Sequence, residues 1–221
     1  MVHAPTVELF SYWRTSATYR VRVAFNLKNI QANERFINVD AGEHQSPEYL
    51  KINPMGAIPA LILSGKAPLT QSLAILEFLE ELQPQPPLLP TDIFERARVR
   101  SIAQMLAVDI HPLITPRIKK HLMHVNGFDD ALWKAWQSKW FTTGLSALEQ
   151  RLASESATGR FCHGDSPTIA DICLMSIVVV MRIFKITVPD IPTIDRIVTA
   201  CEQLDAFVRA EPMRQVGAPS Q

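Results

Sequence analysis

The spacing of hydrophobic positions changes near residue 83, and this change divides the chain into two parts. In the first part, short apolar runs alternate with segments whose apolar residues recur at helical spacing, such as Val21, Ala24 and Phe25. Strands are predicted over 6–11, 35–39, 60–63 and 67–69, and helices over 17–28, 47–51 and 71–82. This order, βαβ followed by ββα, predicts a compact α/β layer.

The second part reads as helical throughout. It follows a cluster of four prolines at positions 84, 86, 87 and 90, which cannot continue a helix and favours a stiff, extended linker. Helices are predicted over 91–106, 116–125, 129–153, 168–184 and 194–210. The pattern therefore predicts an α/β domain over 1–83, a linker over 84–91 and an all-α domain over 92–221.

Composition excludes several classes of protein. The chain has 221 residues, 47% of them hydrophobic, and its 22 basic and 22 acidic residues balance. This share of hydrophobic residues is enough to form a buried core, so we expect a folded protein. The neutral net charge argues against a nucleic-acid partner. The longest apolar stretch, 169–181, is shorter than the roughly 20 residues that a bilayer needs, so no membrane segment is expected.

The cysteines, the histidines and the N-terminal residues indicate the cellular compartment and whether a metal site is expected. The three cysteines, Cys162, Cys173 and Cys201, are an odd number without CxxC spacing, which predicts neither a disulfide framework nor a zinc site. The histidines show no metal-ligand pattern either. Residues 1–10 lack a basic segment followed by an apolar one, so we expect no signal peptide and a cytoplasmic protein.

Three segments of the first domain carry groups suited to an anionic ligand. Thr15 and Ser16 stand where the first strand feeds a helix, whose N-terminal N–H groups and dipole attract anions. One of these hydroxyls can instead cap the helix, which leaves the other available. Gln71 and Ser72 open a second helix in the same way, and capping is the alternative there too.

The third segment is Ile58-Pro59, directly before a predicted strand. Proline lacks an N–H and fits a strand start, and a cis bond there would turn the Ile58 backbone outward. In the second domain, Thr168 and Asp171 have the spacing of a capping box, and we expect them to stabilise the start of a buried helix.

Together these motifs resemble the cytosolic glutathione transferases, and most closely their zeta class, which includes the maleylacetoacetate isomerases. The resemblance rests on residues 14–22, which read Arg-Thr-Ser-Ala-Thr-Tyr-Arg-Val-Arg, on residues 53–59, and on residues 71–75. It extends through 109–113, 144–149 and 164–171. It implies the glutathione transferase fold: a thioredoxin-like α/β N-terminal domain followed by an all-α C-terminal domain. It also implies a homodimer.

The resemblance implies a role for each candidate residue. Thr15 and Ser16 are the catalytic candidates, because a hydroxyl and a helix N-terminus stabilise the glutathione thiolate, which is the nucleophile. The remaining candidate contacts of glutathione are His44, Gln45, Ile58, Pro59, Gln71 and Ser72, and weaker candidates for the substrate are Arg14, Thr115 and Arg117.

The implied function is glutathione-dependent transfer or isomerisation of a small electrophile, in particular cis–trans isomerisation of a maleyl-type dicarboxylate. Ala17 and Ile183 depart from the class, which usually has a cysteine and an arginine there. These departures motivate an alternative, a ligandin-like binding or regulatory protein that keeps the fold without turnover.

Residues 9–28 carry four basic side chains and no acid, which predicts positive potential for an anionic ligand.

Overall fold

The computed structural model describes residues 7–219, and its first part contains a mixed four-stranded sheet. The strands are β1 (Val7–Ser11), β2 (Asn33–Phe36), β3 (Ala60–Leu63) and β4 (Leu69–Thr70), in the order β2-β1-β3-β4. β1 pairs with β2 in parallel and with β3 antiparallel, and β3 pairs with β4 antiparallel. All four predicted strands are present, although β2 and β4 are shifted by about two residues, and Thr6 lies outside the described residues.

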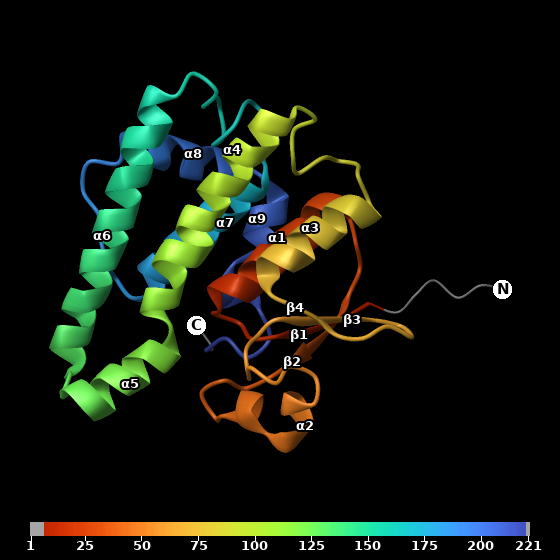
Figure 1. The fold of residues 1–221 in the computed structure, drawn as a ribbon, viewed down its shortest axis with the longest axis vertical. Coiled ribbons are helices and arrows are strands. Elements are labelled where there is room, and N and C mark those ends of the chain that lie inside the picture. The colour runs from red at the N-terminus through yellow and green to blue at the C-terminus, as the bar shows by residue number, and fades with distance from the viewer. Residues whose placement is uncertain (1–6, 220–221) are drawn as a thin grey trace. The chain divides into compact units, whose positions relative to one another are not determined.

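Helices cover both faces of this sheet. Figure 1 shows α1 (Ser16–Lys28) and α3 (Ser72–Leu82) on one side and the short α2 (Pro47–Leu50) on the other. On the α2 side, Phe10, Tyr49 and Ala60 form a buried cluster, with the Phe10 and Tyr49 rings in edge-to-face contact. The 3-10 turn η1 (Glu43–Gln45) precedes α2. This layer places the N-terminal ends of α1 and α3 directly after β1 and β4.

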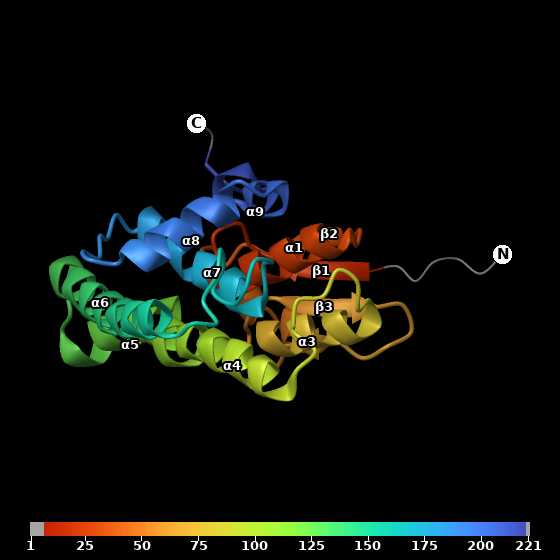
Figure 2. The same cartoon turned by 90° about the horizontal axis from the view of Figure 1, so that it is seen from above.

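The second part is helical, and no strand follows Thr70 within residues 7–219. Its core is α7 (Ile169–Ile183), which packs between α4 (Ile93–Gln104) and α8 (Pro192–Glu202) (Figure 2) and is buried along most of its length. From Ile93 to Glu202 the elements follow in the order α4, the π-helical η2 (Met105–Ile110), the 3-10 turn η3 (His111–Ile114), α5 (Pro116–Asn126), α6 (Asp130–Ser154), α7 and α8.

The predicted capping box at the start of α7 is confirmed. The Asp171 carboxylate accepts hydrogen bonds from the Thr168 backbone N–H and hydroxyl, at 2.7 and 2.8 Å, and from the Cys162 N–H at 2.7 Å. Asp171 is fully buried. Burial raises the pKa of Asp171, while the hydrogen bonds from Cys162 and Thr168 act in the opposite direction.

The compact units of the structure do not follow the chain order that the hydrophobic pattern suggests. One unit combines the stretch that ends at Pro87 with the stretch that begins at Leu204, and the other is Leu88–Gln203. The sequence assigns residues 92–221 to one helical domain, but α9 (Asp205–Ala210) packs on α1 in the first unit.

The single helix predicted over 194–210 is therefore wrong. The chain leaves α8 at Gln203 and starts α9 at Asp205, with Leu204 between them in an extended conformation. The physical reason is that α8 buries its apolar face in the helical unit, whereas Phe207 of α9 is buried in the α/β unit. The 3-10 turn η4 (Pro212–Arg214) ends the set of described elements.

Two features are absent from residues 7–219. None of the helices described there is both long and apolar enough to cross a membrane. In the same residues, no three His, Cys, Asp or Glu side chains lie close enough together to hold a metal ion.

Candidate active site at two helix N-termini

The first helix begins at the pair of hydroxyls that the sequence singles out. Thr15 is the N-cap of α1: its hydroxyl oxygen accepts from the Thr18 N–H at 3.4 Å and lies 2.5 Å from the Thr18 hydroxyl. Ser16, the first helical residue, is only 2% exposed, whereas Thr15 is half-buried. The first turn of α1 contains no acidic residue, so no carboxylate competes there for the N–H groups.

The second helix N-terminus is that of α3. Its N-cap residue Gln71 has φ 70° and ψ 111°, a backbone conformation that costs a residue other than glycine about 1–3 kcal/mol. The Gln71 side chain makes no capping bond, and the first turn of α3 contains no acid. Backbone strain of this kind clusters at functional sites, where the surrounding structure holds it in place.

Arg20 joins the two helix N-termini. This nearly buried side chain donates from Nη1 to Ser72 Oγ at 2.9 Å and from Nη2 to Ser16 Oγ at 3.3 Å. Arg20 is not among the residues that the sequence predicts for the site. Its only signal was the Arg-Val-Arg run at 20–22, which resembles a family motif but does not show what the first arginine contacts.

The loop before β3 carries the third predicted group. The Ile58–Pro59 peptide bond is cis, and Pro59 is buried. The Ala57 carbonyl before it accepts from the Tyr49 hydroxyl and the Asn53 side chain, each at 2.7 Å. These bonds fix the loop that leads to the Ile58 backbone.

His44 and Gln45 lie beside the same loop. Gln45 donates from Nε2 to the Gly56 carbonyl at 3.3 Å, and a Cβ at Gly56 would meet that amide nitrogen at 2.2 Å and the His44 carbonyl at 3.0 Å. Gly56 also has a positive φ of 55°, so glycine suits both the conformation and the space. The structure thus brings these two candidates close to the loop that ends in Ile58-Pro59.

Arg14 is held at the turn between β1 and α1. Asp40 accepts from the Arg14 guanidinium and from the Tyr12 hydroxyl, each at 2.5 Å. Burial raises the pKa of Tyr12, and the hydrogen bond to Asp40 raises it further, which keeps the hydroxyl protonated as a donor.

Most of the positive charge in residues 9–28 is paired with acids from other segments. Arg14 pairs with Asp40, Arg22 with Glu34, and Lys28 with Glu80. The sequence shows a run without acids because each of these partners lies at least 12 positions away. The fold therefore removes much of the local excess.

Two candidate substrate contacts belong to the helical unit. Thr115 precedes α5, but its hydroxyl donates to the Pro112 carbonyl at 3.0 Å and does not cap the helix. Arg117 is exposed in the first turn of α5. Both residues therefore lie at a helix start, as Thr15 and Gln71 do.

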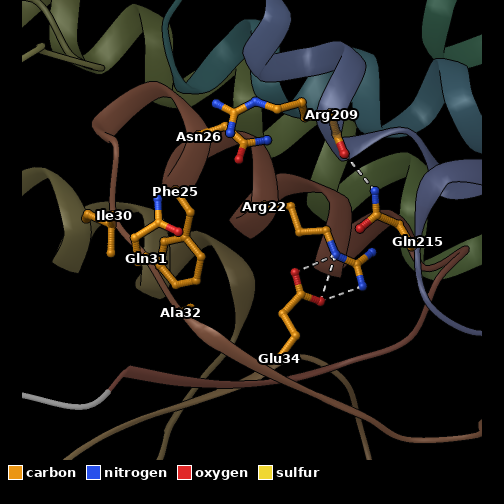
Figure 3. A pocket seen from close by; sticks show the side chains of 9 residues that line it. All are labelled: Arg22, Phe25, Asn26, Ile30, Gln31, Ala32, Glu34, Arg209 and Gln215. Carbon is orange, nitrogen blue, oxygen red and sulfur yellow. Dashed lines mark hydrogen bonds and ion pairs between the residues drawn. The ribbon is translucent and has the colours of Figure 1, made fainter.

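A separate pocket lies on the α/β unit (Figure 3). It has a volume of about 150 Å³ and is lined by residues of α1, β2 and the C-terminal stretch. Arg22 turns toward Glu34 and Arg209 belongs to α9. None of the candidate residues lines this pocket. Arg22, which lines this pocket, and Arg20 are two positions apart on α1, so their side chains point to opposite sides of the helix and the pocket lies away from Arg20.

Comparison with known proteins identifies the family. The family model for the glutathione S-transferase N-terminal domain matches residues 5–81. The chain is 40% identical to a maleylacetoacetate isomerase of Rhizobium meliloti, covering 93% of this chain and 96% of the relative.

Two solved structures extend the likeness over the whole fold. A maleylacetoacetate isomerase from Methylobacterium extorquens AM1, with bound malonate and glutathione, is 46% identical, covers 96% of this chain and 100% of its own, and has a TM-score of 0.94. A holo maleylpyruvate isomerase, described as a bacterial glutathione S-transferase of the zeta class, is 37% identical, with the same coverage and a TM-score of 0.92. The fold and these relatives define a glutathione S-transferase, and within that family the chain belongs to the zeta class.

Proposed function

We propose that this protein is a glutathione-dependent enzyme that isomerises a maleyl-type dicarboxylate such as maleylacetoacetate or maleylpyruvate. The observation that carries the proposal is the pair of helix N-termini, at Thr15-Ser16 and Gln71-Ser72, that Arg20 joins. The names of the relatives support the reaction class, since they are maleylacetoacetate and maleylpyruvate isomerases.

The residues fit the groups of glutathione. Ser72 and the uncapped N–H groups of α3 offer donors for the γ-glutamyl carboxylate. The Ile58 backbone, beside the cis-proline, would pair with the cysteinyl amide. His44 and Gln45 lie along the same loop and would hold the glycyl end. All of these groups belong to one compact unit.

Of the two candidate hydroxyls, we assign Thr15 to the thiol. Bound glutathione supplies a thiolate nucleophile, and a thiol of ordinary pKa, about 8.5, is mostly protonated at neutral pH. Thr15 is half-buried and can turn its O–H from Thr18 toward a ligand, whereas Ser16 is almost fully buried against Arg20. The N-terminus of α1 adds N–H groups that favour the anion.

For the substrate we propose a small dicarboxylate held partly by cations. The Methylobacterium extorquens relative binds malonate, which is itself a dicarboxylate. Arg14 is one candidate contact, because its side chain remains 36% exposed although it pairs with Asp40. Thr115 and Arg117 are the candidates from the helical unit.

An assay of the purified protein tests this function. With glutathione present, maleylacetoacetate or maleylpyruvate is expected to convert to the trans product while total glutathione stays constant. Consumption of glutathione together with a halogenated aromatic substrate would indicate a transferase instead. Binding of glutathione with neither activity would favour the binding-protein alternative, and the absence of binding at millimolar glutathione would contradict the proposal.

We also propose that the protein is a homodimer. Ile93 and Phe94, adjacent residues in the first turn of α4, are 74% and 80% exposed, and such an apolar pair is a suitable anchor for a second copy. A Phe94→Glu variant is expected to weaken the dimer by about 30-fold or more, as loss of an interface anchor does.

Light scattering after size-exclusion chromatography measures this effect. Val216→Glu is the matched control, because Val216 is similarly exposed, at 78%, but lies outside α4, and the mass of this variant should equal that of the wild type. A wild-type monomer, or a Phe94→Glu variant that dimerises as tightly as the wild type, would contradict the proposal.

The cytoplasm is the compartment that we propose. All three cysteines are free and buried, which suits a reducing environment. Fractionation of the source cells checks this, and recovery of the protein outside the cytoplasmic fraction would refute it.

A further inference from the structure

We propose that Arg20 is a positioning residue that orients Ser72 for glutathione and ties it to Ser16 at the N-terminus of α1. The proposal rests on the proposed function, because it concerns the same site. Its basis is the pair of hydrogen bonds by which one buried guanidinium reaches the first residue of α1 and the first residue of α3.

The direction of these bonds fixes the role of each serine. A guanidinium has only donors and stays charged at every working pH. Each serine oxygen therefore accepts from Arg20, and its own proton serves a different partner. For Ser72, at the N-terminus of α3, a carboxylate is the acceptor that we infer.

Two nitrogens of one planar group are needed for this arrangement. Nη1 reaches Ser72 and Nη2 reaches Ser16, so the spacing of the two hydroxyls follows the shape of the guanidinium. A lysine ammonium is a single point and cannot reproduce that spacing. Burial of all three side chains, each between 2% and 6% exposed, keeps water from replacing these bonds.

A second link between the same helices shows what is particular to Arg20. Lys28 donates to the Glu80 carboxylate at 2.7 Å, two turns further along both α1 and α3. Both links join residues 52 positions apart, so the two helices run in parallel. Lys28 thus forms an ion pair at the far end, whereas Arg20 contacts two hydroxyls at the end where the site lies.

A double-mutant cycle tests the proposal through the Kd for glutathione, measured by calorimetry. Arg20→Lys and Ser72→Ala are each expected to weaken binding by about tenfold, the value of one lost hydrogen bond to a charged group. The double variant should be no weaker than either single variant, because both changes remove the same interaction. The control Lys28→Met/Glu80→Met should leave the Kd unchanged, since it removes a link at the other end of the helices.

If Arg20→Lys does not fold, the same cycle is measured with Ser16→Ala and Ser72→Ala, which should be coupled through Arg20. Independent effects of the two members of a cycle, or an unchanged Kd in folded Arg20→Lys, would overturn this proposal while leaving the proposed function intact. Failure of the wild type to bind glutathione would overturn both.

Discussion

Replacing Thr15 by valine is expected to lower kcat/KM for the glutathione-dependent reaction by about 100-fold. Valine keeps the shape of threonine but removes the hydroxyl that we assign to the thiolate, and losing one such donor costs roughly 10²–10³-fold in rate. Without this donor the pKa of the bound thiol moves back toward about 8.5, so the acid limb of the pH–rate profile should move to higher pH.

Steady-state kinetics across pH measure both effects, and two controls separate catalysis from folding. Thr15→Ser keeps the hydroxyl and should keep most of the activity. Asp92→Ala removes the N-cap of α4, which accepts from the Phe94 and Glu95 N–H groups, and should leave turnover unchanged. A Thr15→Val variant with the wild-type rate and pH profile would rule out the assignment, and a shift in Ser16→Ala alone would transfer it to Ser16.

Replacing Asp171 by alanine is expected to cost about 3–5 kcal/mol of the free energy of unfolding. The change leaves two backbone N–H groups and the Thr168 hydroxyl without their acceptor, all in a fully buried position. Each buried donor without a partner costs about 1–3 kcal/mol.

Urea unfolding of the wild type, Asp171→Ala and Asp92→Ala at neutral pH measures the free energy of unfolding of each. Asp92→Ala is again the matched control, because Asp92 makes the same kind of cap at an exposed position and should cost about 1 kcal/mol. Equal losses in the two variants would show that burial does not add to the value of the cap.

The pH dependence of stability follows from the same carboxyl. Burial raises the pKa of Asp171 in the folded state above the unfolded value of about 4. The folded state therefore holds the proton more tightly, and this contribution is present below about pH 4 and lost as pH rises through the folded pKa. The free energy of unfolding, measured across pH, should therefore vary less with pH in Asp171→Asn than in the wild type.

Much of the α/β layer could be predicted because its signals are local. The strand and helix over 60–63 and 71–82 depend on apolar spacing within one segment, and the structure places them at Ala60–Leu63 and Ser72–Leu82. The capping box of Thr168 and Asp171 is local as well, since its two members are three residues apart. The hydroxyl pair at 15–16 could be found for the same reason.

The sequence by itself therefore determined most of the elements, the starts of α1, α3 and α7 and, through its motifs, the family. Only the tertiary structure decided which distant groups meet. It joined Arg20 to Ser72 across 52 positions, paired Arg14 with Asp40, and placed α9 on α1. Local spacing reflects the repeat of one helix or strand, whereas contacts between elements depend on how the chain folds back, which no single segment records.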